Sequence, residues 1–180
     1  MTDIIFGVPA IALTIIAYYQ TDRLRFLKIN VFAVFFFGMT LLVKNGVTGA
    51  MVSFMSVAVY IAAIFLGDEI RKKLSYILPL LAFAISFQSY ETNIAELAIK
   101  RELLVVLPYL PSVAAFLVTL SALQSRIVTN KLLLMIALFI WASYSFLLMA
   151  WFAFAADIIG IFVLVLSLRK IQSQRACMPH

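Results

Sequence analysis

One carboxylate, Asp157, lies inside the apolar stretch AWFAFAADIIG, which runs from Ala150 to Gly160. An ionised aspartate deep in a membrane helix costs about 2.5–3.5 kcal/mol on insertion scales, so something must offset that cost. The side chain can face a wet cavity and bind a solute, a cation or a proton. It can also hold helices together through hydrogen bonds, or lie at the membrane interface if its helix begins elsewhere. The sequence alone leaves these three interpretations open.

Four other side chains in apolar runs are candidates to share a site with Asp157. Ser53 and Ser56 are three residues apart and therefore lie on one face of a helix. Trp141 can stack on a flat solute and Tyr144 can line a cavity. Core packing and anchoring at the membrane interface are the ordinary alternatives for such rings. We take these five residues as the predicted substrate-binding set.

The reactive groups of the chain do not suggest an enzyme or a metal site. An intramembrane hydrolase needs paired carboxylates, a serine with a histidine, or metal ligands. Asp157 has no second deep carboxylate, the one histidine is His180, and the one cysteine is Cys177 in the tail. We therefore expect no catalytic residue, no metal and no cofactor.

The composition points to a lipid bilayer as the surrounding medium. The 180 residues are 65% hydrophobic and 12% charged, whereas a soluble domain carries roughly a quarter charged residues. The net charge of +6 comes from basic residues in short groups between apolar runs, which is typical of membrane topology signals and not of a nucleic-acid-binding patch. The composition therefore predicts an integral membrane protein.

Polar breaks divide the chain into seven apolar runs, each near the roughly 20 residues that cross a bilayer core. The predicted spans are 4–19, 26–43, 47–66, 74–90, 103–123, 132–149 and 151–168. The last two have no charged break between them, but one helix over both would be about 55 Å long, so we expect a turn near Ala150. The first run follows no basic segment, and we expect it to be retained and not cleaved as a signal peptide.

The basic residues are distributed unequally between the two sides of this topology. The loops after the first, third and fifth spans and the C-terminal tail hold eleven of the 14 basic residues. These are Arg23, Arg25, Lys28, Arg71, Lys72, Lys73, Arg126, Lys131, Arg169, Lys170 and Arg175. Because cytoplasmic loops are enriched in lysine and arginine, the sequence predicts an outside N-terminus and a cytoplasmic C-terminus.

A weak internal repeat relates the two ends of the chain. An offset of 104 residues aligns Gln20 with Gln124 and Ser53 with Asp157, and a two-residue gap brings Pro9 onto Pro111. The pattern predicts two parallel three-helix repeats joined by a linker helix, an arrangement found in transporters. The predicted parts are residues 1–73, a linker helix with a polar outer loop at 74–102, residues 103–170, and a tail at 171–180.

Two segments carry a resemblance to a known family. YYQTDRLRFLKINVFAVFFFGMTLLVKNGVTGAMVSF and WASYSFLLMAWFAFAADIIGIFVLVLSLRK resemble the YgjV-type bacterial inner membrane proteins, which are distantly similar to the SWEET, PQ-loop and PnuC group. The resemblance implies a location in the bacterial inner membrane, a 3+1+3 helix plan, and a substrate site between the triplets. Pro9 and Pro111 would be the prolines of the first helix in each triplet, although neither is followed by glutamine. Each is a candidate hinge or a static kink.

We therefore expect a small-solute transporter or facilitator with a cavity between the two repeats. The third and seventh spans should face each other, with Ser53 and Asp157 pointing inward. A membrane interaction or assembly protein without transport is the alternative. A polar, hydrated cavity would favour transport, and a dry, tightly packed core would favour the interaction role.

Overall fold

The computed structural model describes residues 2–44, 46–90 and 109–176, and every regular element in these ranges is an α-helix. The helices are α1 (Thr2–Tyr19), α2 (Arg23–Val43), α3 (Val47–Phe65), α4 (Asp68–Tyr90), α5 (Tyr109–Leu123), α6 (Ile127–Leu147) and α7 (Trp151–Ala176). The prediction of an all-α fold is confirmed. The start of the fifth predicted span, the polar loop after the fourth span, and the end of the tail lie outside the described residues.

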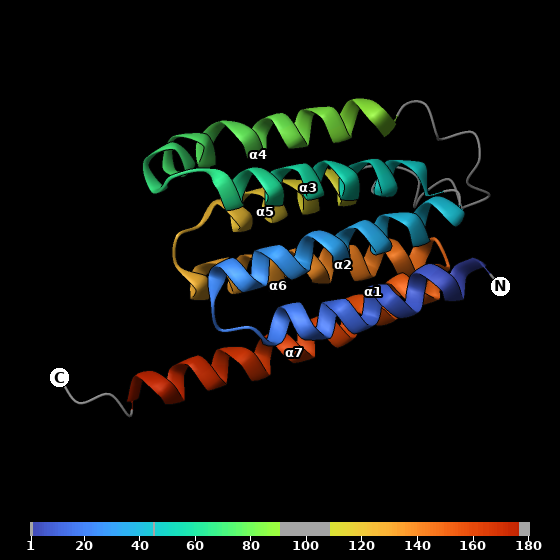
Figure 1. Ribbon diagram of the computed structural model, residues 1–180. Coiled ribbons are helices and arrows are strands. Elements are labelled where there is room, and N and C mark those ends of the chain that lie inside the picture. Colours follow the sequence, from blue (N-terminus) through green and yellow to red (C-terminus); the bar gives the residue numbers. More distant parts are fainter. Residues whose placement is uncertain (1, 45, 91–108, 177–180) are drawn as a thin grey trace.

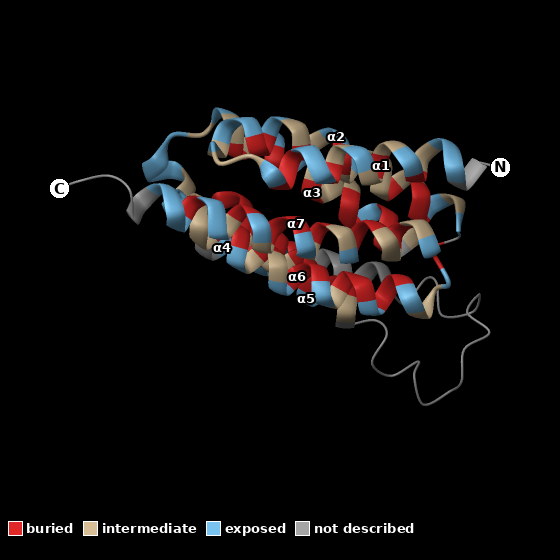
Figure 2. Ribbon diagram, turned by 90° about the horizontal axis from the view of Figure 1, so that it is seen from below, coloured by how far each residue is buried: buried red, intermediate tan, exposed pale blue. Residues whose placement is uncertain are grey.

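Three helices are long and apolar enough to cross a membrane. They are α2, α6 and the part of α7 from Trp151 to Gln174. Helices α1, α3 and α5 contain shorter apolar segments, Ile4–Tyr19, Gly49–Phe65 and Leu110–Leu123. Buried positions lie on the helix faces that point between the helices, and exposed positions lie on the outer faces (Figure 2). Many of the exposed residues are large and apolar, such as Phe65 and Phe162. This pattern is compatible with a protein surrounded by lipid.

Six helices form a closed ring, and α4 lies outside it. Each of the pairs α1–α2, α2–α3, α5–α6 and α6–α7 is in contact, and the pairs α1–α7 and α3–α5 close the ring. Helix α4 packs against α5 and more lightly against α3, at one edge of the molecule (Figure 1). The α1–α2, α3–α4 and α5–α6 connections and the C-terminal end of α7 share one end of the molecule, which we call the basic end (Figure 1).

The helices at the basic end are longer than their apolar runs. Helix α4 begins at Asp68 and α6 begins at Ile127, where the sequence suggested starts at 74 and 132. The prediction that Arg71 and Lys131 lie in loops is therefore wrong. Apolar content locates the hydrocarbon crossing, whereas arginine, lysine and glutamate are good helix formers that extend a helix beyond it. The side chain of Asp22 also starts α2 early, because it accepts a hydrogen bond from the Arg25 N–H at 2.8 Å.

The helix bounds follow the 104-residue offset. Helices α1 and α5 end 104 residues apart, α2 and α6 both begin and end 104 apart, and α3 and α7 begin 104 apart. Backbone hydrogen bonds after α2 and α6 repeat at the same offset: Gly46 N–H donates to Leu41 O, and Ala150 N–H donates to Ser145 O, each at 2.9 Å. The local structure of the two ends is thus more alike than their sequences.

The expected turn near Ala150 is confirmed. Helix α6 ends at Leu147, α7 begins at Trp151, and Met149 between them has a φ of 53°. Met149 N–H donates to Phe146 O at 3.0 Å, which together with the bond from Ala150 forms a Schellman-type helix end. Glycine usually occupies this left-handed position because a side chain is strained there.

Two glycines leave room for a tyrosine ring to pack against the backbone of a neighbouring helix. A Cβ added to Gly160 in α7 would lie 2.7 Å from Tyr18 Cε2, and one added to Gly49 in α3 would lie 2.8 Å from Tyr144 Cε1. Each ring therefore rests directly on the backbone of a helix from the other end of the chain. Gly49 near the start of α3 thus allows close packing of the kind that small residues permit between membrane helices.

Candidate functional site

A small cavity lies at the centre of the ring. Residues from α1, α2, α3, α5, α6 and α7 line it, and α4 contributes none of the described residues to it. The space open to the centres of water-sized molecules is about 40 Å³. At about 10–15 Å³ for each water, this is room for roughly three. The cavity therefore suits an ion, a few waters or a very small solute.

Asp157 faces this cavity from α7. The residue is 2% exposed, and its Oδ2 accepts a hydrogen bond from Ser145 Oγ on α6 at 3.2 Å. The carboxylate thus combines two features that the sequence left as alternatives, a place in a cavity wall and a bond to a neighbouring helix. Among the described lining residues it is the one carboxylate, and no lysine, arginine or histidine accompanies it.

Ser53 and Ser56 line the same cavity from α3. Their hydroxyls donate one turn back along the helix, Ser53 to Gly49 O at 2.8 Å and Ser56 to Val52 O at 2.9 Å. Because each hydroxyl has one proton, the atoms left for a ligand are oxygen lone pairs, which accept hydrogen bonds. These two positions therefore present acceptors.

The two aromatic candidates from α6 differ in position. Trp141 lines the cavity and packs edge-on against Phe37, with ring centroids 5.7 Å apart. Tyr144 does not line the cavity; its ring packs against Trp141 at 5.6 Å and rests on Gly49. The structure thus brings Asp157 together with Trp141 and the two serines, and places Tyr144 behind the tryptophan as a packing residue.

Two further tyrosines line the cavity, Tyr18 in α1 and Tyr60 in α3, and neither was predicted from the sequence. Both are buried, and the Tyr60 hydroxyl lies within interaction range of the Asn30 side chain, which is also buried. Spacing was an available signal, because Tyr60 lies four residues after Ser56 and therefore shares its helix face.

A buried lysine ties the two ends of the chain together at the basic end. Lys131 in α6 is 0% exposed, and its Nζ donates to Tyr18 O at 2.7 Å, to Gln20 O at 2.5 Å, and to Ser167 Oγ. The two carbonyls lie at the C-terminal end of α1, where helix carbonyls have no intrahelical partner and the helix dipole favours a cation.

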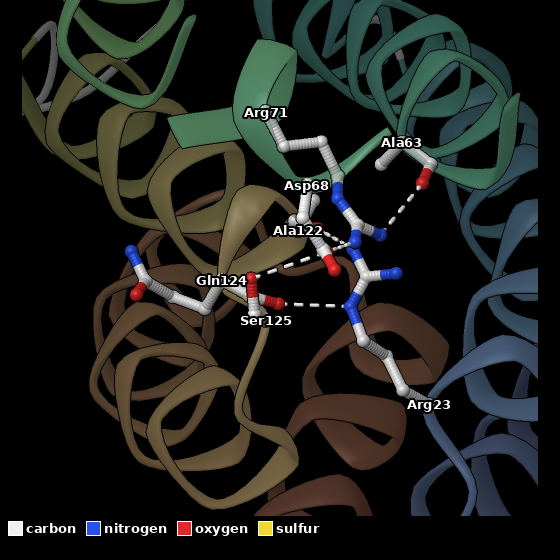
Figure 3. Close-up of polar contacts among 7 residues, drawn as sticks. All are labelled: Arg23, Ala63, Asp68, Arg71, Ala122, Gln124 and Ser125. Atoms are coloured by element: carbon white, nitrogen blue, oxygen red, sulfur yellow. Dashed lines mark hydrogen bonds and ion pairs between the residues drawn. The ribbon is translucent and has the colours of Figure 1, made fainter. Parts of the chain in front are cut away.

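A second cation makes the reciprocal contact. Arg23 at the start of α2 donates from Nε to Gln124 O at 2.8 Å and from a terminal nitrogen to Ala122 O at 2.9 Å (Figure 3). These acceptors lie at the end of α5, each 104 residues after an acceptor of Lys131. We call the Lys131 and Arg23 contacts the reciprocal clamps, since Lys131 in α6 caps the end of α1 and Arg23 in α2 caps the end of α5.

Arg71 adds a third connection beside Arg23 (Figure 3). It donates to Ala63 O near the end of α3 at 3.4 Å and pairs with Asp68, which is 74% exposed. Ser125, in the α5–α6 connection, donates to the same carboxylate at 3.4 Å. Because Asp68 is exposed, its ion pair adds little stability, whereas the buried Lys131 connects its helices more strongly.

The two predicted hinge prolines lie in different settings. Pro9 is inside α1, where it removes one helix hydrogen bond, whereas Pro111 is the third residue of α5 and is buried. A third proline, Pro79, lies inside α4. Hinge motion at Pro9 or Pro111 stays a prediction.

Comparison with protein-family models, with curated proteins and with solved structures finds no match to this chain. Within the described residues, no three histidine, cysteine, aspartate or glutamate side chains gather as they would around a metal ion. The cavity and the clamps are therefore the features of the chain that bear on its function.

Proposed function

We propose that this chain is a seven-span membrane protein that transports a small polar solute, or facilitates its passage, through the central cavity. In this proposal α1–α3 and α5–α7 are two parallel repeats and α4 is the linker. The shared 104-residue offset of the helix bounds and the closed six-helix ring support it. The resemblance to the YgjV-type proteins fits the same plan, with the basic end in the cytoplasm of a bacterium.

The observation that carries this proposal is the buried carboxylate in a largely apolar cavity on the axis of the ring, which it shares with two serines. A core that served only packing would gain nothing from Asp157, because burial of a carboxylate costs free energy. The cavity wall also comes from both triplets, so relative movement of the triplets would change access to it. This is the geometry that alternating access requires.

The reciprocal clamps define what such movement must break. Lys131 and Arg23 each connect one triplet to the other at the basic end. For the cavity to open towards that end, the clamp hydrogen bonds must separate. The structure would accordingly represent a state closed at the basic end.

One observation favours a second function, that of a membrane interaction or assembly protein without transport. The hydrogen bond from Ser145 to Asp157 joins α6 to α7, and polar bonds of this kind hold membrane helices together. In that case the carboxylate is a structural group, and its loss would affect folding alone.

Uptake and binding measurements on the purified chain in proteoliposomes separate these two functions. A panel of small cations, neutral polyols and amino acids is compared for the native chain, Asp157→Asn and Asp157→Ala. Transport requires that a solute is taken up and that both variants, while still folded, lose the uptake. If the variants fold poorly and retain any uptake that is found, the carboxylate is a structural group and its binding role is refuted. If the native chain takes up no solute of the panel, the transport proposal fails.

Ser143→Ala is the matched control for these variants. Ser143 lies on α6 near Ser145, is exposed, and donates to Phe139 O at 3.0 Å within its own helix. Its loss should leave both uptake and folding unchanged. A comparable loss in the control would show that any change on α6 disturbs the protein, which would remove the support for a role of the carboxylate.

A further inference from the structure

The central cavity has the chemical character of a cation site. A cation as its ligand would narrow the substrate class of the proposed transport function, on which this inference rests. The wall carries one carboxylate and, among the described residues, no basic side chain to neutralise it. Within the protein an ionised carboxylate without a counter-ion is strongly unfavourable. Ser145 donates one hydrogen bond to Asp157 but supplies no charge. A bound cation would supply it, whereas without a cation the carboxyl group is neutralised by taking up a proton.

The hydrogen-bonding groups of the wall select a ligand that donates. The protons of Ser53 and Ser56 are used by carbonyls of their own helix, which leaves their oxygens as acceptors. The Tyr60 hydroxyl is also buried in the wall, beside the Asn30 side chain, and its oxygen can accept a hydrogen bond while its proton can be donated. Together with the carboxylate, these groups offer acceptors on several sides. An ammonium group, which has only donors, complements them.

Aromatic rings form a large part of the remaining wall, beside aliphatic side chains such as Leu134 and Leu138. Tyr18, Phe37, Tyr60 and Trp141 contribute rings from four helices, α1, α2, α3 and α6. Aromatic faces attract cations, and enclosed aromatic sites are the usual recognition device for ammonium groups. Magnesium and calcium prefer several oxygen ligands, commonly more than one carboxylate, and would find one carboxylate here. The wall therefore favours a weakly hydrated monovalent cation.

Size limits the choice further. The space open to water-sized centres is about 40 Å³, which admits a cation of a few heavy atoms. We propose that the cavity binds a small ammonium cation, ammonium or methylammonium, with Asp157 as its counter-ion, the Ser53 and Ser56 oxygens as acceptors, and the Trp141 ring against it.

Binding of radiolabelled methylammonium to the full chain in proteoliposomes tests this proposal. We expect saturable binding that ammonium displaces and that sodium and erythritol do not. Asp157→Asn should bind at least about 10-fold more weakly, because a hydrogen bond to a charged group is worth a factor of that order or more. Asp157→Glu, which keeps the charge, should retain part of the binding. Trp141→Leu should weaken binding about 3- to 30-fold, the range of a cation–ring contact.

Ser143→Ala serves again as the control, and thermal melting of each variant reports folding. If Asp157→Asn does not fold, the Asp157→Glu and Trp141→Leu comparisons decide. Displacement by potassium alone would overturn the ammonium assignment, and so would binding that Asp157→Asn leaves unchanged. Uptake of a neutral solute without methylammonium binding would overturn the cation inference and leave the transport proposal standing. Failure of every solute in the panel to bind would overturn both.

Discussion

Replacing Lys131 by methionine should destabilise the protein more than most single substitutions near the end of a helix do. Methionine keeps most of the side-chain length and removes the ammonium group that contacts Tyr18 O, Gln20 O and Ser167 Oγ. Hydrogen bonds from a charged donor contribute about 1.5–3 kcal/mol each, which is roughly 5–9 kcal/mol for the three. Burial of the charge itself costs several kcal/mol, and the variant avoids that cost. The net loss should be about 2–3 kcal/mol.

Thermal melting of the purified protein in detergent measures this loss. For a chain of this length each kcal/mol lowers Tm by about 2–4 °C, so Lys131→Met should melt roughly 4–12 °C below the native chain. The control is Lys170→Met at the same end of the molecule. Lys170 is exposed and lies 4.5 Å from the centre of the Tyr19 ring, a contact worth about 0.5–1 kcal/mol. Equal melting temperatures for the two variants would refute the argument that the buried ammonium connects the triplets.

Three further predictions follow from local geometry. Gly160→Ala should destabilise the protein by about 1–3 kcal/mol in denaturant unfolding, because the new Cβ would lie 2.7 Å from a ring carbon. Gly67→Ala should not destabilise the protein in this way, because a Cβ added there would meet no atom within 4 Å. Equal losses for the two variants would refute the argument from tight packing at Gly160. Met149→Gly should raise stability by about 0.5–1 kcal/mol, since the φ of 53° suits glycine, and a lower Tm would contradict this. Ser145→Ala should cost about 1–3 kcal/mol by removing the donor to a buried carboxylate. Ser143→Ala should cost less than about 0.5 kcal/mol, and similar losses for the two serines would count against the bond.

Energetic cost and helix length made part of this structure predictable. The penalty for a lipid-facing Asp157 indicated an inward position, and the offset placed Ser53 with it; the structure brings both to one cavity. The length limit for a single crossing located the turn near Ala150. In each of these places one physical constraint acts on a short stretch of sequence and leaves few alternatives.

The clamps were not predictable by the same means. Lys131 was counted as a loop charge, because a lysine at the border of an apolar run normally reaches water. Its burial depends on carbonyls at the end of α1, 111 and 113 positions away along the chain. Tyr60 was not predicted as a site residue, because it lies within an apolar run where a tyrosine is an ordinary packing residue. Both roles arise from tertiary neighbours that no local pattern specifies.

The reciprocal clamps also show how the two ends of the chain can share helix bounds at a 104-residue offset while their sequences differ. The acceptors are main-chain oxygens, at residues 18 and 20 in one half and at 122 and 124 in the other. No substitution can remove a peptide carbonyl, so the requirement for a donor persists whatever side chains surround it. The donors are free to differ: Arg23 is the first residue of α2, whereas Lys131 lies one turn inside α6, four residues beyond the equivalent Ile127. The two halves thus satisfy the same backbone requirement with different residues at different positions. A sequence alignment therefore does not detect that the two contacts are equivalent.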